Sequence, residues 1–313
     1  MSQYVFGVDI GGTTVKLGLF DVTGGLLDKW EIPTRTEDSG SKILPDIAES
    51  IKAKIDEKKI AKEEVKGVGV GAPGPIDSAG VVHKAVNLGW ETFSIKETLE
   101  ELLHMPVMAG NDANVAALGE MWKGGGQGSN DLIVVTLGTG VGGGIIIDGK
   151  VLTGATGAGG EIGHIHVQDG ETEACGCGNK GCLEQYASAT GITRLANKKL
   201  RESDKNSVLR QGEVSAKTVF DAVKEKDELA IEVAEEFGKY LGDALAVIAS
   251  VVNPEAIVIG GGVSKAGEIL LNYIRPNYEK NVFHGSRNAK FALATLGNDA
   301  GIYGAAKLVL DLK

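Results

Sequence analysis

Three cysteines within eight positions are the residues of this chain whose chemistry is easiest to predict. Cys175, Cys177 and Cys182 are all the cysteines of the sequence, and an odd number does not suit a framework of disulfides. His164 lies eleven positions upstream and would complete a Cys₃His set, a usual tetrahedral zinc site. His166 is a competing fourth ligand, and three reduced thiols without a metal are the alternative. The spacing predicts one structural Zn²⁺.

Two turns rich in glycine and threonine have the composition of phosphate-binding loops. They are Gly11-Gly12-Thr13-Thr14 and Gly138-Thr139-Gly140. Glycine exposes backbone N–H groups with no Cβ in the way, and threonine hydroxyls add donors. Asp9, just before the first turn, is a candidate for holding Mg²⁺, mostly through water. A plain hairpin turn is the alternative for either turn alone, but two of them favour a nucleotide site.

A third glycine segment, Gly260-Gly261-Gly262, stands between a predicted strand and a predicted helix. Such a triplet lets a flat base or a ribose pack against the backbone, and a helix N-terminus favours anions. None of the three segments has the spacing GxxxxGK[ST] or GxGxxG, so a P-loop and a Rossmann site are disfavoured. Together the three segments predict binding of ATP with Mg²⁺.

Acidic residues near these motifs are candidates for contacts with a substrate. Asp112 opens a predicted helix, where it is either an N-cap or a general base that takes a proton from a substrate hydroxyl. Glu161 and Glu184 flank the metal ligands and suit the hydroxyls of a sugar, the alternative being a solvated or supporting role. A zinc-bound imidazole at His164 keeps its other ring N–H free to donate.

The elements that must position these residues alternate between strands and helices, which is typical of α/β architecture. Strands are expected at residues 4–10, 15–21, 26–32, 65–70, 107–109, 132–137, 141–147, 256–259 and 290–295. Helices are expected at 41–58, 94–103, from 112 to about 123, from about 231 to 252, and at 300–312. The strand–turn–strand pattern occurs at 4–21 and again at 132–147. This repetition predicts a duplicated α/β fold with a cleft between its halves.

A run of glycines at 124–128 is the best candidate for a domain boundary. We expect a smaller N-terminal α/β domain of residues 1–122 together with the C-terminal helix 300–313. The larger C-terminal α/β domain would then be 123–299, with the zinc loop at 161–184.

Composition excludes several classes of protein. Glycine accounts for 46 of the 313 residues, about twice the usual share of about 7%, and it clusters at strand ends. The net charge of −10 disfavours a nucleic-acid partner, because affinity for phosphate backbones comes mainly from clustered Lys and Arg. No signal peptide and no apolar run of about 18 residues is visible. We expect a cytoplasmic protein with no membrane partner.

These motifs together resemble the ROK family of sugar kinases and repressors, in the actin-like ATPase (ribonuclease H-like) superfamily. The most specific segment is Gly160-Glu161-Ile162-Gly163-His164, followed by the three cysteines and Glu184. The resemblance extends over nearly the whole chain, from Asp9 to the segment 296–301. Residues 71–75, 86–90 and 111–122 are most similar to the glucokinases of Gram-positive bacteria.

The resemblance implies ATP-dependent phosphorylation of D-glucose at its 6-hydroxyl, with Asp112 as the general base and a homodimer as the assembly. It implies that the cysteines and His164 hold zinc, with His164 also touching the sugar. The two glycine-threonine turns would hold phosphates and the glycine triplet the adenosine. The sugar contacts that it implies are Gly74, Asn87, Asn111, Asp112, Glu161, His164 and Glu184.

Other functions remain open from the sequence. A kinase of the same family for N-acetylmannosamine, fructose or allose would use similar machinery. A sugar-sensing regulator without turnover and a zinc-stabilised interaction module are the alternatives from other classes. The family's repressors carry an N-terminal helix-turn-helix, whereas this sequence opens on a predicted strand, so a repressor is disfavoured.

Overall fold

The computed structural model describes residues 3–311, which separate into two compact units. The first unit contains the chain up to Gly128, then Gly144–Gly160, and the chain from Leu296 onward. The second unit contains Ser129–Gly143 and Glu161–Thr295. The sequence predicted one domain of residues 1–122 with 300–313 and another of residues 123–299, and these boundaries stay a prediction. The compact units differ from them in placing residues 144–160 in the first unit. Residues 312 and 313 of the predicted closing helix lie outside the described residues.

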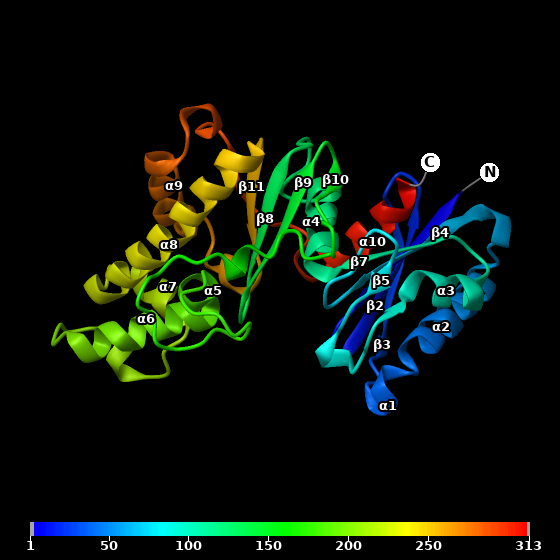
Figure 1. Cartoon of the computed structure of the whole chain (residues 1–313), viewed down its shortest axis with the longest axis horizontal. Coiled ribbons are helices and arrows are strands. Elements are labelled where there is room, and N and C mark those ends of the chain that lie inside the picture. The colour runs from blue at the N-terminus through cyan, green and yellow to red at the C-terminus, as the bar shows by residue number, and fades with distance from the viewer. Residues whose placement is uncertain (1–2, 312–313) are drawn as a thin grey trace. The chain divides into compact units, whose positions relative to one another are not determined.

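The first unit is built on a five-stranded sheet in which three strand ends meet at one edge. The order is β3-β2-β1-β4-β7, with β1 at Tyr4–Ile10, β2 at Thr14–Asp21, β3 at Leu26–Pro33, β4 at Val65–Ala72 and β7 at Val107–Asn111 (Figure 1). β1, β4 and β7 are parallel, and their register aligns Asp9 with Gly71 and Gly71 with Gly110. Parallel strands end at the same edge, so the segments after these three residues are brought together.

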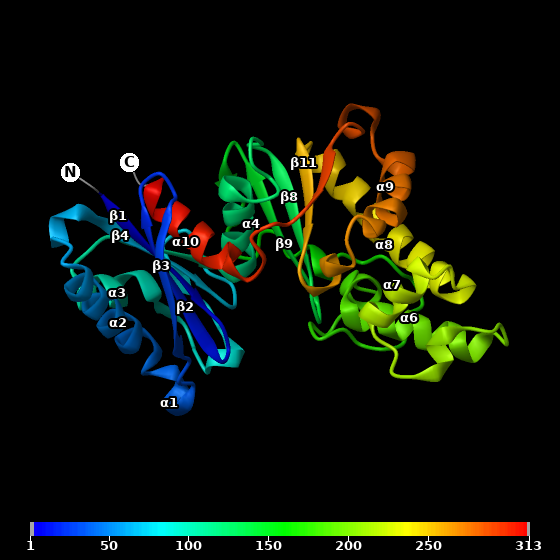
Figure 2. The ribbon, with the colours of Figure 1, turned by 180° about the vertical axis from the view of Figure 1, so that it is seen from behind.

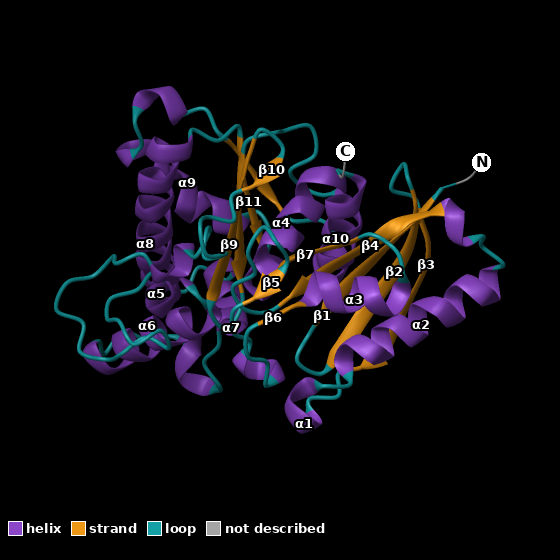
Figure 3. Cartoon of the chain, turned by 45° about the vertical axis from the view of Figure 1, so that its right-hand side comes forward, coloured by secondary structure: helices purple, strands orange, loops and turns teal. Residues whose placement is uncertain are grey.

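Helices cover both faces of this sheet, as Figure 3 shows. On one face α2 (Ile43–Lys58) and α3 (Ile95–Leu103) bury an apolar core with Phe6, Val8 and Ile10 of β1. On the other face α10 (Ala300–Leu310) packs on β1 and β4 and against α4 (Asp112–Lys123). This packing requires glycine: a Cβ on Gly7 would lie 2.0 Å from Ile302 O, and one on Gly69 would lie 1.7 Å from Ala305 O.

The second sheet repeats the strand order of the first. Its order is β10-β9-β8-β11-β12, with β8 at Leu132–Leu137, β9 at Val141–Ile147, β10 at Lys150–Val151, β11 at Ala256–Gly260 and β12 at Lys290–Leu293. In each sheet the third strand in sequence order lies outermost beside the second, and the two later strands pair in parallel on the other side of the first. The predicted duplication of an α/β fold is therefore confirmed.

Among the described residues, the α-helices of the second unit all lie between Glu184 and Asn281. They are α5 (Glu184–Ala187), α6 (Ala189–Glu202), α7 (Ala216–Lys224), α8 (Glu228–Val252) and α9 (Ile269–Asn281). α8 and α9 lie side by side (Figure 2). Minor elements of the first unit are α1 (Glu37–Gly40) and the short strands β5 (Val81–Val82) and β6 (Phe93–Ser94). Within residues 3–311, no helix is both long and apolar enough to cross a membrane.

A buried carboxylate on α4 fastens two segments of the first unit. Glu120 is 2% exposed. Its Oε2 accepts from Gly125 N at 2.8 Å, and its Oε1 accepts from Leu296 N at 2.9 Å. Buried carboxylates persist only when hydrogen bonds replace their hydration. Glu120 thus ties the glycine loop after α4 to the segment that leads into α10.

Replacing Glu120→Gln should destabilise the protein, because an amide turns an N–H group toward one of two backbone N–H donors. A buried donor left unsatisfied costs about 1–3 kcal/mol, so we expect the thermal midpoint to fall by roughly 2 °C or more. Glu101→Gln on the exposed side of α3 is the control and should stay within about 0.5 kcal/mol of the parent. Equal melting of the two variants would contradict this role of Glu120.

Candidate functional site

The head of α4 presents the predicted base to solvent. Asp112 is the first residue of α4 and is exposed. The N-cap is Asn111, whose Oδ1 accepts from Ala113 N at 3.0 Å and from Asn114 N at 3.2 Å. The alternative interpretation of Asp112 as the N-cap is therefore wrong. Asp112 Oδ1 accepts from Ala113 N at 2.8 Å, so the carboxylate sits in the first helical turn, where negative charge is favoured.

Hydrogen bonding joins the predicted sugar contacts of the first unit. Asn111 Nδ2 donates to Gly74 O at 3.0 Å, so with its oxygen already used twice this amide has one N–H left for a ligand. Gly74 has a φ of 92°, and a Cβ there would lie 2.3 Å from Lys84 O. Asn87 lies exposed on the 3-10 turn Val86–Leu88, shortly after Lys84. Gly74, Asn87 and Asn111 thus occupy adjoining segments.

Asp9 differs from Asp112 in its surroundings. Its pKa is raised to about 6, mainly by burial and then by the negative charge of Asp112, against the opposing charge of Lys16. A Cβ on Gly301 would lie 2.5 Å from Asp9 Cγ, so the carboxyl packs against the first turn of α10. Sequence reasoning did not identify Lys16 as a residue near Asp9, and no motif or periodic pattern pointed to it. Gly301 was noted only as part of the segment 296–301. Both act through tertiary contacts.

The two glycine-threonine turns close hairpins in separate units. In the first, Gly11 N donates to Thr14 O at 3.0 Å, between β1 and β2. In the second, Gly138 N donates to Gly140 O at 3.0 Å, between β8 and β9. A Cβ on Gly12 or on Gly138 would meet no described atom within 4 Å. Glycine at these two positions is thus not demanded by packing and leaves the backbone open to a ligand.

The glycine triplet lies beside the second turn. Gly261 has a φ of 83°, and a Cβ there would lie 2.5 Å from the backbone of Leu137, the residue before Gly138. The segment that follows is a short 3-10 turn, Gly262–Ala266, and α9 begins only at Ile269. A cavity of about 330 Å³ adjoins the triplet, with a largely apolar wall suited to a flat base. Its lining includes Ala189, Phe220, Gly262, Val263, Lys217 and Lys265.

The thiols and one imidazole converge in the second unit. His164, Cys175, Cys177 and Cys182 each offer a ligand atom, and these atoms all lie within 4.8 Å of one another. Cys177 Sγ lies 3.7 Å from Cys182 Sγ, and Cys175 Sγ lies 3.7 Å from His164 Nδ1. Two thiolates on a tetrahedral zinc at about 2.3 Å would be about 3.8 Å apart, so the donor set fits this metal.

The competing ligand, His166, is engaged elsewhere. Its Nε2 lies 2.9 Å from Asp169 Oδ1, and its Nδ1 lies 3.0 Å from Lys180 O. The predicted glutamates instead lie on either side of His164. Glu161 Oε2 is 4.0 Å from His164 Nε2, and Glu184 Oε1 is 4.0 Å from His164 Nδ1. The structure thus brings both carboxylates to the metal-type cluster.

Glu184 also lies beside the second phosphate-type turn. Val141 N lies 3.4 Å from Glu184 Oε2, and a Cβ on Gly140 would lie 2.5 Å from the same oxygen. Glu184 Oε1 lies 3.0 Å from Cys175 Sγ. One carboxylate therefore joins the second turn to the cysteine cluster.

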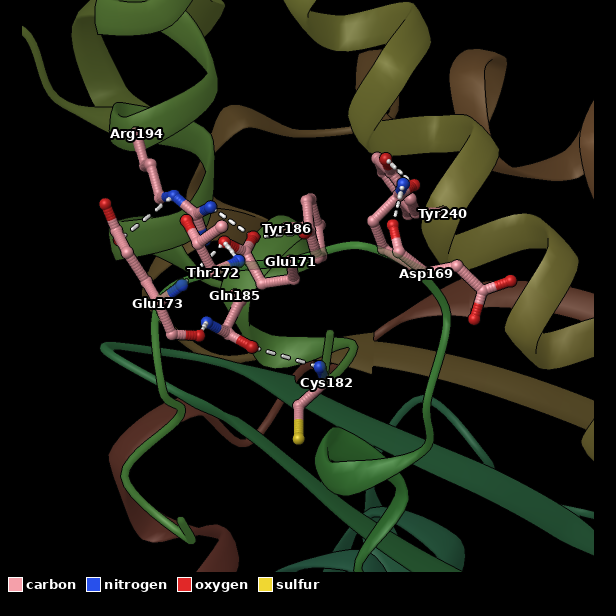
Figure 4. A network of polar contacts seen from close by, with 10 residues as sticks. Asp169, Glu171, Thr172, Glu173, Cys182, Gln185, Tyr186, Arg194 and Tyr240 are labelled. Carbon is pink, nitrogen blue, oxygen red and sulfur yellow. Dashed lines mark hydrogen bonds and ion pairs between the residues drawn. The ribbon is translucent and has the colours of Figure 1, made fainter. Parts of the chain in front are cut away.

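A polar network that no motif announced holds this region in place (Figure 4). The buried carboxylate of Glu171 accepts from Tyr186 Oη, from Arg194, and from Thr172 N at 2.8 Å. These hydrogen bonds and the charge of Arg194 lower the pKa of Glu171 to about 2 despite its burial. The network anchors the loop before the cysteines to α5 and α6.

Gln185 extends the same network to the cysteines. Its Nε2 donates to Glu173 O at 3.0 Å, and its Oε1 accepts from Cys182 N at 3.1 Å. Gln185 directly follows Glu184, so the position of that carboxylate depends on this bracing. Residues 171, 186 and 194 do not follow a helical or strand spacing, so only the fold shows that their side chains are in contact.

Comparisons with known proteins agree with this geometry. The model of the ROK family matches residues 5–312. The chain belongs to the ROK family. It is 45% identical to a glucokinase of Halalkalibacterium halodurans over 98% of this chain and 95% of that protein, and 36% identical to a glucokinase of Streptomyces coelicolor over 97% of each.

Solved structures of the ROK family share the fold. A ROK family glucokinase from Streptomyces griseus, crystallised with glucose and AMPPNP, superimposes with a TM-score of 0.73 at 36% identity. The superposition covers 97% of this chain and 98% of that one. The predicted actin-like ATPase fold is confirmed for this ROK chain by its architecture and by these neighbours.

The raised pKa of Asp9 predicts a pH-dependent stability in the absence of Mg²⁺ and nucleotide. Between its ordinary value of 3.8 and about 6, the folded chain keeps a proton that the unfolded chain has lost. Stability should therefore fall as pH rises through this window, by at most about 3 kcal/mol. Asp9→Asn cannot titrate, so its thermal midpoint should overtake that of the parent above pH 6.

Thermal midpoints measured from pH 4 to 8 test this expectation. Asp204→Asn, an exposed carboxylate of the second unit, is the control and should follow the parent. Parallel curves for the parent and Asp9→Asn would show that burial does not perturb Asp9.

Proposed function

We propose that this chain is a glucokinase, which transfers the γ-phosphoryl group of ATP to the 6-hydroxyl of D-glucose. The observation that carries the proposal is the exposed carboxylate of Asp112 at the head of α4, beside the Asn111–Gly74 pair and within electrostatic range of Asp9. The glucokinases among the chain's relatives match it over nearly its full length, which supports the choice of substrate.

The proposed reaction is a direct displacement. Asp112 accepts the proton of the 6-hydroxyl as the sugar oxygen attacks the γ-phosphorus. The bond between this phosphorus and the oxygen shared with the β-phosphate breaks, and ADP leaves with that electron pair. The proton ends on Asp112 and passes to solvent, to which this residue is exposed. The products are glucose 6-phosphate and ADP.

Charge separates the roles of the two aspartates. Asp112 is exposed in the first turn of α4, where a substrate hydroxyl can reach its carboxylate. Asp9 is the candidate for holding Mg²⁺ that arrives with ATP, and the divalent cation would favour its ionised form. Gly11, Gly12, Thr13 and Thr14 and the turn Gly138-Thr139-Gly140 would bind phosphates, with the adenosine at Gly260-Gly261-Gly262.

Sugar hydroxyls would be recognised by groups from several segments. In the first unit these are the backbone at Gly74 and the side chains of Asn87 and Asn111. In the second unit they are Glu161, His164 and Glu184. With Nδ1 of His164 directed at the cysteines, its Nε2 is left to donate to a hydroxyl, and Glu161 and Glu184 supply acceptors.

The proposed zinc is structural and would be held by His164, Cys175, Cys177 and Cys182. Zinc in a closed four-ligand site supplies cross-linking of the loop and no redox chemistry. The loop 161–183 contains only the 3-10 turn Ile162–His164 among its regular elements, so packing alone constrains it weakly. The ligands and the Glu171 network would together hold Glu161 and Glu184 at the sugar.

A homodimer and a cytoplasmic location remain predictions from the sequence. The helices after Ile231 were the predicted interface. On α8, Val247 is 63% exposed and Val251 is 81% exposed, and their spacing of four residues puts them on one face of the helix. This pair supports an interface on α8.

Asp112→Asn should lower kcat for glucose phosphorylation by about 10²–10⁴-fold, because the amide cannot accept the hydroxyl proton. Glucose binding, measured by calorimetry, should change little, since the substitution preserves shape. Asp148→Asn is the matched control: Asp148 has a φ of 51°, a conformation that Asn tolerates well. Near-normal turnover of Asp112→Asn would overturn its assignment as the base.

A panel of hexoses with ATP tests the substrate. Glucose should give the highest kcat/KM, with phosphate on the 6-oxygen. Preference for N-acetylmannosamine, fructose or allose would identify another kinase of the family. Binding of a sugar without release of ADP would favour a regulator, and no response to ATP or sugar would favour a zinc-stabilised interaction module.

Loss of one thiol should remove the metal. We expect the purified chain to contain about one zinc, and Cys177→Ser to retain far less, with a lower thermal midpoint and a raised KM for glucose. His166→Gln is the matched control, since His166 lies outside the four-residue cluster. Elemental analysis that finds zinc unchanged in Cys177→Ser, or lost in His166→Gln, would contradict this ligand set.

A further inference from the structure

Asn114, in the first turn of α4, has a side-chain amide whose nitrogen, but not its oxygen, has a hydrogen-bond partner among the described residues. The residue is 3% exposed. Its Nδ2 donates to Gly159 O at 3.4 Å, which is long for a hydrogen bond. Among the described residues, no donor reaches its buried Oδ1. A buried acceptor without a partner is rare in proteins and calls for an explanation.

Asn114 is the last member of a chain of amide contacts. Asn111 Nδ2 donates to Gly74 O at 3.0 Å, and Asn111 Oδ1 accepts from Asn114 N at 3.2 Å. Asn114 in turn reaches Gly159. The contact to Gly159 is the longest of the three and therefore the weakest link.

One end of this chain of contacts lies at residues proposed to bind sugar, and the other end lies close in sequence to one. Gly74 and Asn111 are at one end, and Gly159 lies two positions before Glu161 at the other. Gly159 N donates to Thr153 O at 2.8 Å, so the segment 153–159 forms a loop closed by its own backbone hydrogen bond. Asn114 is thus the side chain that fastens the exit of this loop to the helix that carries Asp112.

Space beside Asn114 allows this contact to change. A cavity of about 290 Å³ in the first unit is lined by Asn114 together with Asn111, Val115, Leu118 and Thr153. Close packing therefore does not force the amide into its present place. A side chain of similar branched shape but without polar atoms, such as the somewhat larger leucine, can also be accommodated beside this cavity.

We infer that Asn114 is a positioning residue for the sugar, which fastens Gly159, two positions before Glu161, to α4 once glucose is bound. The weak bond and the unpartnered oxygen belong to the sugar-free state, and binding of the sugar tightens the contact between Asn114 and Gly159. Asn114 itself does not touch the substrate. This inference rests on the proposed function.

The test compares Asn114→Leu with the parent and with Asn197→Leu. Asn197 is the matched control, because its Nδ2 also donates to a backbone oxygen, Thr193 O at 3.0 Å, on a helix of the second unit. In Asn114→Leu the sugar-free thermal midpoint should be unchanged or higher, because an unsatisfied buried oxygen is removed. The KM for glucose should rise about tenfold while kcat changes less.

Hydrogen exchange of the segment 153–161 supplies a readout besides activity. In the parent and in Asn197→Leu, glucose should slow exchange there; in Asn114→Leu this protection should be largely lost. A lower sugar-free midpoint with an unchanged KM and unchanged protection would show that Asn114 is merely structural and would overturn the inference. A parent chain that phosphorylates no hexose would instead overturn the proposed function, so the two failures are distinguishable.

Discussion

The first unit depends on the direct contact between the backbone of α10 and the face of its sheet. Gly7 and Gly69 leave no side chain between β1, β4 and the helix, so the carbonyls of Ile302 and Ala305 lie where a Cβ would be. The same approach brings Gly301 against Asp9. Because β1, β4 and β7 are parallel and in register, fixing one strand end also fixes the turns that follow the other two. The proposed base, the proposed magnesium ligand and the Gly74 turn are all located by this packing.

The second unit holds its proposed sugar carboxylates by a different means. Most of the loop between Glu161 and Glu184 has no regular secondary structure, and its backbone is paired only by isolated bridges such as His166 with Cys182. Side chains add to these bridges: the cluster of three thiols and His164, and the buried Glu171 with Tyr186 and Arg194. The rigidity of this loop therefore depends on these side-chain contacts. The metal-type cluster and the ion-pair network both lie within the segment from His164 to Arg194.

Two aspartates of the first unit lie in different environments, which suits them to different proposed roles. Asp9 is sheltered, and its pKa is raised to about 6, whereas Asp112 is exposed in the first turn of a helix. Each carboxylate influences the other through charge, so a cation near Asp9 would also affect Asp112. The proposed transfer of a proton to Asp112 and the proposed binding of MgATP near Asp9 are therefore electrostatically coupled.

Much of this protein follows from its sequence alone. Alternating strands and helices, the repeated strand–turn–strand pattern and the spacing of His164 and the cysteines determine local structure and local chemistry, because they act over a few residues. Tertiary structure alone decided that Asn111 rather than Asp112 caps α4, that His166 bonds Asp169 instead of joining the thiols, and that Glu171 meets Arg194. It also brought Lys16 and Gly301 to Asp9 and left Asn114 Oδ1 without a partner among residues 3–311. The physical reason is that burial, charge, close approach and the choice between neighbouring polar groups depend on how the folded chain places its side chains, which sequence spacing alone does not encode.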